Sequence, residues 1–257
     1  MVAGDLARLG WVRFPHDPAV ARWAEAALGA ARRVVADPAM AHWLQCEGTW
    51  FVGVDALPNT SDGSIAGVPL SGPWEALTGP LPPLHPAQLS VIYPGYPRPR
   101  DGEGEAAFRY RARRDGAHLD GLLPEGAERR RHLREPHAWI LGLPLTDTQP
   151  GAAPMVVWEG SHAILRDTFA RAFEGHAPED WGEIDVTDAY QAARRRIFET
   201  CRRVEIHARP GEAYLVHRLA LHGIAPWTAP HSANPDGRIV AYFRPLLGRP
   251  GAWLEAP

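Results

Sequence analysis

Lysine is absent from this chain, because all 27 of its basic residues are arginine. This absence excludes Schiff-base and general-base chemistry that depends on a lysine amine. Cysteine is scarce as well, with Cys46 and Cys201 as the two in the sequence. Two such cysteines cannot build a thiolate metal cluster, and they do not imply a structural disulfide. A reducing, cytoplasmic setting is therefore expected.

Long apolar runs are also missing. No stretch approaches the roughly 18 apolar residues of a membrane-spanning helix, and residues 1–14 contain no apolar segment of signal-peptide length. The formal net charge of -3 does not point to nucleic acid as a partner. We expect a small-molecule substrate, no nucleic acid and no membrane. The oligomeric state stays unknown, since an exposed apolar patch cannot be seen in a sequence.

Proline and glycine are abundant, at 26 and 25 residues, and they favour a loop-rich β fold over a helical bundle. Helical spacing of apolar residues predicts helices at 17–36, 163–174 and 186–200. Short apolar or alternating runs between turn residues predict strands at 50–54, 88–93, 107–113, 138–145, 155–158, 204–208, 213–217 and 238–243. The pattern indicates a mainly β sandwich or barrel with added helices.

The most informative motif is His118-Leu119-Asp120. In an extended strand, residues two apart point to the same face, so His118 and Asp120 can both reach one metal ion. Further along, His222 precedes a glycine, and Arg238 begins the next predicted strand. Two histidines and one carboxylate leave open positions on a metal, which suits Fe(II) that must bind a keto acid and O₂ together. An arginine fork suits the far carboxylate of that keto acid.

Two of these assignments have a competitor. His217 lies near the same strand as His222, and we favour His222 as the metal ligand. Arg244 has the same strand parity as Arg238, so the two can face the same way. We place Arg238 ahead of Arg244, because it starts the strand that follows the His222 loop.

These motifs resemble the phytanoyl-CoA dioxygenase-like family of Fe(II)/2-oxoglutarate oxygenases. The resemblance spans residues 88–245, and it rests on His118-Leu119-Asp120-Gly121, on 155–162 with its Gly160-Ser161-His162, and on 210–212 leading to Leu221-His222-Gly223. Two departures stand out: Glu159 replaces the proline that usually precedes Gly-Ser-His, and a loop insertion at 228–236 lengthens the gap to Arg238.

The resemblance implies one domain, 1–257, with a double-stranded β-helix (jelly-roll, cupin-like) core at 86–247. A helical and loop-rich part, 1–85, precedes that core. It also implies Fe(II) on His118, Asp120 and His222, with 2-oxoglutarate on Arg238 or Arg244 and O₂ as the oxidant. Ser161 and His162 are then structural residues rather than ligands. The implied reaction hydroxylates a C–H bond and releases succinate and CO₂.

Two other readings of the same residues remain open. The three ligands could hold Zn²⁺ in a hydrolase or isomerase, or the jelly roll could be a catalytically inert binding protein. The dense basic stretch 129–134 could attract an anionic substrate or could be a solvated face. Trp139 and Trp158 are expected to be core aromatics, whereas Trp50 could belong to a substrate wall.

Overall fold

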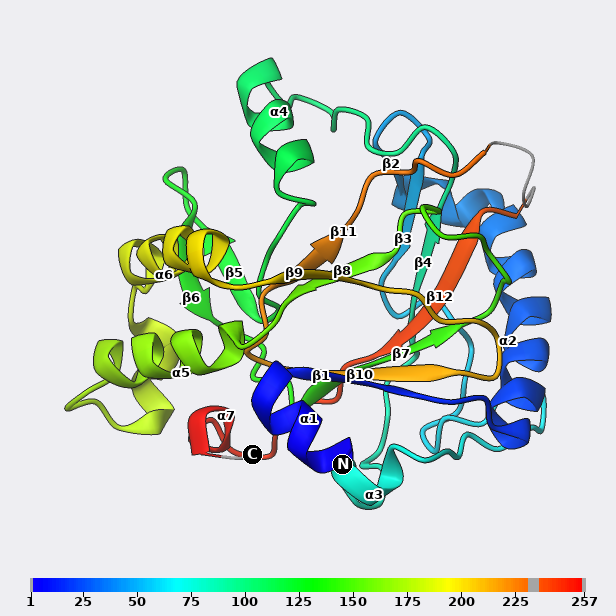
Figure 1. Ribbon diagram of the computed structural model, residues 1–257, viewed down its shortest axis with the longest axis horizontal. Coiled ribbons are helices and arrows are strands. Elements are labelled where there is room, and N and C mark those ends of the chain that lie inside the picture. The colour runs from blue at the N-terminus through cyan, green and yellow to red at the C-terminus, as the bar shows by residue number, and fades with distance from the viewer. Residues whose placement is uncertain (1, 231–235, 256–257) are drawn as a thin grey trace.

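Two antiparallel β-sheets face each other, with helices on their outer sides (Figure 1). The computed structural model describes residues 2–230 and 236–255. The central part of the predicted loop insertion, residues 231–235, lies outside the described residues. In strand order, the larger sheet contains β1 (Trp11–Phe14), β10 (Ala213–His217), β7 (Trp139–Pro144), β12 (Arg238–Phe243), β4 (Gln88–Ile92), β3 (Trp50–Gly53) and β2 (Leu44–Gln45).

The smaller sheet has the order β11 (His222–Ile224), β8 (Met155–Trp158) and β9 (Arg203–Ile206). A separate hairpin pairs β5 (Leu122–Glu125) with β6 (Arg130–Leu133). Apolar side chains from both sheets fill the space between them, including Ile140 and Val240 from the larger sheet and Val157 from the smaller one. This arrangement is the expected double-stranded β-helix.

Along strand β12, successive side chains alternate between the interior of the jelly roll and the outer face of the larger sheet. Val240 and Tyr242 belong to the interior cluster between the sheets. Ile239, Ala241 and Phe243 belong to the cluster on the outer face of the larger sheet. Arg238 and Arg244 have the parity of Val240, so the strand directs both arginines inward.

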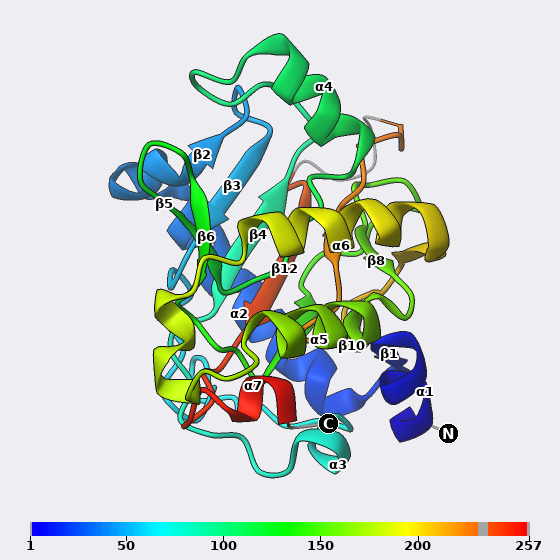
Figure 2. The same cartoon turned by 90° about the vertical axis from the view of Figure 1, so that its left-hand side faces the viewer.

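Helix α2 (Pro18–Ala36) covers the outer face of the larger sheet (Figure 1). Its first turn is capped by Asp17, whose carboxylate accepts hydrogen bonds from the amides of Ala19 and Val20. Helices α5 (Ser161–Ala172), α6 (Thr187–Thr200) and α7 (Ala252–Glu255) pack on the side of the smaller sheet (Figure 2). The remaining helical segments are α1 (Val2–Leu9), η1 (Pro38–Trp43), α3 (Glu75–Thr78), α4 (Glu105–Arg113) and η2 (Pro178–Glu183).

One predicted strand is wrong: residues 107–113 belong to helix α4. The alternation of Phe108 and Tyr110 with arginines imitates a strand, yet α4 buries no side chain and has no strand beside it. The i,i+4 ion pair of Arg109 with Glu105 suits the helix instead. Arg111 pairs with Glu103, which lies just before the helix. The other predicted strands and helices are present, each shifted by no more than two residues.

The N-terminal part contributes more strand than expected, because β1, β2 and β3 all join the larger sheet. Residues 11–14 pair with β10 over their whole length. The division at 85/86 stays a prediction. Among the described residues, no helix combines the length and apolar character needed to cross a membrane.

Candidate metal centre

His118 and His222 face each other across a single antiparallel bridge. The amide of His118 donates to the carbonyl of His222 at 2.8 Å, and the amide of His222 donates back at 3.1 Å. Residues paired in this way project their side chains to the same face. The two imidazole rings therefore lie 4.6 Å apart, centroid to centroid.

Each of these histidines is oriented by a backbone carbonyl. Nδ1 of His118 lies 3.0 Å from the carbonyl oxygen of Gly116, and Nδ1 of His222 lies 2.9 Å from that of Ala220. A carbonyl can only accept, so Nδ1 donates a proton in both rings and Nε2 is the nitrogen that faces the centre of the cluster. This is the arrangement in which an imidazole ligates a metal through Nε2.

Asp120 completes the cluster. Its Oδ1 lies 3.3 Å from Nε2 of His118 and 3.7 Å from Nε2 of His222. One ligand atom from each of the three residues falls within 4.8 Å of the others, so all three can reach one ion. The side chain of Asp120 is 10% exposed, whereas that of His118 is 49% exposed. Access to the cluster is therefore from the His118 side.

Arg244 supports Asp120 from the end of β12. Its Nη1 donates to Oδ2 of Asp120 at 3.1 Å. Burial acts to raise the pKa of Asp120, but His222, His118 and Arg244 together hold that pKa well below its usual range. Burial likewise acts to lower the pKa of His222, and the Asp120 carboxylate raises it above its usual value. The cluster is thus a charged carboxylate surrounded by groups that stabilise its charge.

Gly121 allows the chain to turn away directly after Asp120. It has φ +84°, and an added Cβ would clash with the carbonyl oxygen of Glu135. The same carbonyl belongs to the segment that leads into β7. The glycine after the His-x-Asp motif is therefore required for the close approach that positions Asp120.

The metal pocket is a cavity of about 340 Å³ that contains all three candidate ligands and Arg244. Its walls are largely apolar, with polar side chains at Gln88, Ser90 and Glu135. The remaining lining residues are Trp50, Val52, Val54, Leu123, Ile140, Met155, Gly223, Ile224 and Tyr242. Trp50 is thus a pocket residue. Sequence reasoning did not indicate that Tyr242, Leu123 and Ser90 line the same pocket, because the parity of a strand does not show which face meets a pocket until its partner strands are known.

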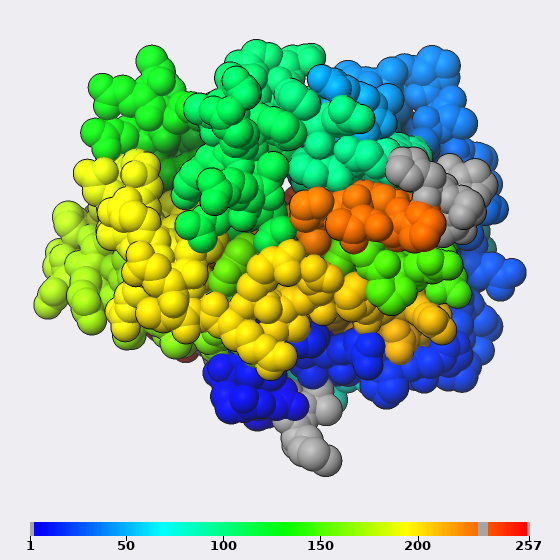
Figure 3. All heavy atoms as spheres, turned by 45° about the horizontal axis from the view of Figure 1, so that its top comes forward, coloured from blue at the N-terminus to red at the C-terminus, as the bar shows by residue number. Residues whose placement is uncertain are grey.

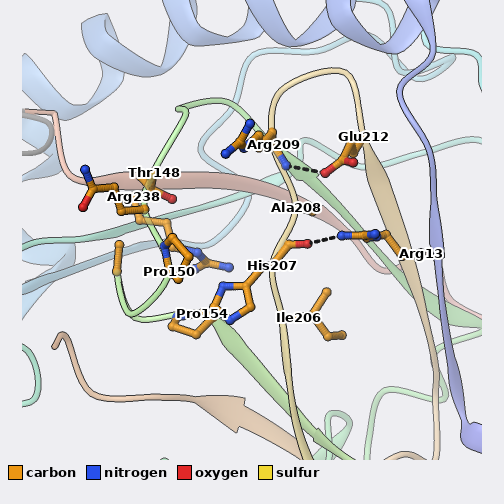
Figure 4. Close-up of a pocket in the computed structure, with 12 residues that line it drawn as sticks. Arg13, Thr148, Pro150, Pro154, Ile206, His207, Ala208, Arg209, Glu212 and Arg238 are labelled. Carbon is orange, nitrogen blue, oxygen red and sulfur yellow. Dashed lines mark hydrogen bonds between the residues drawn. The ribbon is translucent and has the colours of Figure 1, made fainter. Parts of the chain in front are cut away.

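Arg238 lies at a different cavity. It is 7% exposed, and its Nη1 has no hydrogen-bond partner among the described residues. It lines a cavity of about 330 Å³. Figure 4 shows it there together with Thr148, His207 and Arg209. Its guanidinium interacts with the hydroxyls of Tyr214 and Tyr242. Tyr242 also lines the metal pocket, so its side chain contacts both Arg238 and that pocket.

His217 lies outside the ligand cluster. Its Nδ1 accepts a hydrogen bond from the amide of Leu219 at 2.9 Å, and Nη2 of Arg166 lies 3.0 Å from its Nε2. Burial lowers the pKa of His217 to about 2, with Arg218 and His162 adding to the effect. It is a buried, neutral histidine, whereas His222 faces Asp120.

The Gly160-Ser161-His162 segment supports the strand that carries His222. Oγ of Ser161 accepts a hydrogen bond from the amide of Leu221 at 2.9 Å. Nε2 of His162 contacts the carbonyl oxygen of Ala7 at 2.9 Å. Glu159, which stands where the family has proline, accepts from the indole of Trp11 at 3.1 Å. All three contacts tie the N-terminal segment and β11 to the start of α5.

The basic stretch 129–134 forms part of the β5–β6 hairpin, and its arginines divide between two sides. Arg130 pairs with Glu128, and Arg134 pairs with Glu125 and Glu183 at the surface. Arg129 and Arg131 instead line a cavity next to His118. The solvated face is therefore present at Arg130 and Arg134, and the attraction of an anionic substrate by this stretch stays a prediction.

Neither a protein-family model nor a curated protein matches this sequence. Solved structures do. The non-haem, α-ketoglutarate-dependent carbocyclase SnoK from nogalamycin biosynthesis superimposes with a TM-score of 0.54 and 15% identity, over 95% of this chain and 81% of that one. The epimerase SnoN in complex with Fe³⁺, α-ketoglutarate and nogalamycin RO gives 0.51 and 17%, over the same shares of the two chains.

The chain has the fold of the non-haem, α-ketoglutarate-dependent enzymes. The resemblance drawn from the sequence is confirmed at the level of this fold. Within residues 2–230 and 236–255, one group of histidines, cysteines and carboxylates is spaced to hold a metal ion. It consists of His118, Asp120 and His222.

Proposed function

We propose that this chain is an Fe(II)- and 2-oxoglutarate-dependent dioxygenase that oxidises a C–H bond of a small molecule. The observation that carries the proposal is the His118, Asp120, His222 cluster, in which both Nε2 atoms face one buried carboxylate. Two imidazoles and one carboxylate on a face of the ion leave room for a chelating keto acid and O₂. The fold, which the chain has in common with SnoK and SnoN, supports the same reading.

The residues present fit both groups. The two Nδ1 atoms are engaged by carbonyls, so Nε2 of each ring, once deprotonated, would hold Fe(II) together with the Asp120 carboxylate. Arg238 offers a buried guanidinium nitrogen without an acceptor. Because Arg244 is already engaged by Asp120, we assign the far carboxylate of 2-oxoglutarate to Arg238 and place Arg244 beside the metal. When bound, iron and 2-oxoglutarate activate O₂ for oxidation of the substrate.

The protein's own contribution is orientation and exclusion of water. The carbonyls of Gly116 and Ala220 fix the two imidazoles, and Arg244 fixes the carboxylate. The apolar walls of the metal pocket keep water from the reacting carbon. For hydroxylation, the substrate C–H, 2-oxoglutarate and O₂ become C–OH, succinate and CO₂. SnoK is a carbocyclase and SnoN an epimerase, so proteins with this fold catalyse different reactions. For this chain we propose hydroxylation.

The first experiment is anaerobic addition of Fe(II) and 2-oxoglutarate, with the visible metal-to-ligand charge-transfer band as the readout. We expect a band in the wild type, no band in His222→Ala, and no band in Arg238→Ala at the same 2-oxoglutarate concentration. Arg249→Ala, whose side chain is 67% exposed, is the matched control and should keep the band.

Each alternative has its own result. If Fe(II) binds and no band forms in the wild type, the oxygenase proposal fails and a hydrolase or isomerase with the same ligands takes its place. If Fe(II) does not bind at all, the chain is an inert jelly-roll binding protein. A band that survives in Arg238→Ala overturns the assignment of Arg238 and transfers the far carboxylate to Arg244. The cytoplasmic location stays a prediction.

A further inference from the structure

A second cavity, of about 440 Å³, adjoins the metal pocket and is lined by arginines; we call it the arginine pocket. The arginines come from three parts of the chain: the segment through α4, the β5–β6 hairpin, and α6. Figure 3 shows the first and last of these on one face, with α4 in green and α6 in yellow. The arginines that line the pocket are Arg100, Arg111, Arg114, Arg129, Arg131 and Arg194.

The positive charge in this pocket is largely uncompensated. The one acidic lining residue, Asp115, is engaged by Arg203 at 2.7 Å and 3.0 Å. Arg111 is neutralised by Glu103, through two hydrogen bonds at 2.8 Å and 2.7 Å. Among residues 2–230 and 236–255, the other five arginines of the pocket form no ion pair with a carboxylate.

Neutral groups hold at least three of these five guanidiniums in place. Arg131 donates to the carbonyl of Leu122 at 3.0 Å, and Arg194 donates to the carbonyl of Ala117 at 2.8 Å. Arg114 lies over the ring of Phe198 at 4.4 Å. Such contacts orient a guanidinium without cancelling its charge.

Two observations indicate that the arginines of this pocket lack an anionic partner. Nε of Arg194 is buried and has no hydrogen-bond acceptor in the described chain. Burial lowers the pKa of Arg131, and the neighbouring charges of Arg129 and Arg194 lower it further. Holding like charges together costs free energy, and a bound anion would offset that cost.

The arginine pocket adjoins the metal pocket. Trp50, His118 and Ile224 line both cavities. Beyond them, the walls of the metal pocket are mainly apolar, with Val52, Val54 and Leu123 among its lining residues. A ligand with its anionic end among the arginines would therefore extend over the candidate metal ligand His118 toward apolar walls.

We propose that the arginine pocket binds a phosphate or diphosphate group of the substrate, whose uncharged part enters the metal pocket for oxidation. The role as a substrate site rests on the proposed function. Five guanidiniums without an ion-paired carboxylate exceed what a single carboxylate can neutralise, whereas a diphosphate carries several charges. Its oxygens also match the fork of guanidinium donors. This assignment narrows the substrate to a phosphorylated small molecule.

The test is calorimetric binding of inorganic pyrophosphate to the metal-free protein at low ionic strength. Arg114→Gln/Arg129→Gln removes two exposed arginines of the pocket. Arg113→Gln/Arg130→Gln removes the same charge from adjacent positions that do not line it. We expect the wild type to bind, the pocket variant to bind about tenfold more weakly or worse, and the control variant to stay within about twofold.

Three results would overturn the proposal: no binding to the wild type, equal weakening in both double variants, or tighter binding of citrate than of pyrophosphate. The last of these would assign the pocket to carboxylates. Because the measurement needs neither iron nor 2-oxoglutarate, its result is independent of the charge-transfer band. A protein that forms the band without binding pyrophosphate keeps its proposed function and loses this substrate class.

Discussion

Arg244 donates a hydrogen bond to Asp120 across 3.1 Å, although the two residues are 124 positions apart in the chain. Both side chains are largely buried, at 17% and 10% exposure. Arg244 therefore supplies a positive charge to the Asp120 carboxylate, whose other close neighbours are the imidazoles of His118 and His222. A divalent metal ion bound to the same carboxylate would be a second cation in the cluster.

Arg244→Gln should destabilise the metal-free protein by about 3 kcal/mol, because the buried carboxylate of Asp120 loses its charged partner. A metal ion would then restore part of the lost charge. We expect Mn(II) to raise the melting temperature more in this variant than in the wild type, as measured by thermal unfolding with and without the ion.

Arg249→Gln is the control for this comparison, since it removes a surface arginine paired with Glu255. An exposed pair of this kind contributes little to stability. If both variants lose the same stability, or if Mn(II) shifts Arg244→Gln no more than the wild type, Arg244 does not compensate the charge of Asp120.

Gly121→Ala should lower the free energy of unfolding more than Gly126→Ala does. Both glycines have positive φ, at +84° and +66°, so alanine is strained by about 1 kcal/mol or more at either position. At Gly121 the new Cβ also meets the carbonyl oxygen of Glu135, whereas at Gly126 it meets nothing within 4 Å.

Denaturant titration of both variants measures this difference. We expect Gly121→Ala to lose at least about 2 kcal/mol more stability than Gly126→Ala, because an added methyl group in a well-packed region forces the backbone to shift. Equal losses would show that the segment after Asp120 can move aside, and that the glycine of the His-x-Asp-Gly motif is not needed for packing.

His217 makes the stability of the fold sensitive to acid. Burial lowers its pKa to about 2 in the folded protein, against 6.5 for the unperturbed group. The unfolded chain therefore binds a proton that the folded protein does not. This contribution to stability is complete above about pH 6.5 and is lost progressively as the pH falls toward 2, by up to about 1.4 kcal/mol per pH unit.

Chemical denaturation between pH 7.5 and pH 4.5 tests this sign. His217→Gln should lower stability at pH 7.5 and flatten its decline with acid. His176→Gln, at an exposed position, is the matched control and should leave the slope unchanged. A wild-type slope equal to that of His217→Gln would mean that His217 takes up its proton in the folded state.

Local sequence was sufficient for much of the site. The two-residue spacing of His118 and Asp120 and the period of two along 238–244 depend on backbone geometry that neighbouring residues determine. These features predicted that His118 and Asp120 share a face, which the His118, Asp120, His222 cluster confirms. They also predicted that Arg238 and Arg244 can face the same way. The glycine at 121 and the helix cap at Asp17 are local signals of the same kind.

Only the tertiary structure decided which distant groups meet. The bridge between His118 and His222 and the placement of Arg244 on Asp120 depend on how separate strands pair. The same holds for the arginine pocket, which joins Arg131 of a hairpin to Arg194 of a helix. Residues 107–113 were misread as a strand because alternation is compatible with either structure until a partner strand is present or absent. The sequence thus determined the chemistry available and its local orientation, and long-range packing determined which charges lie together.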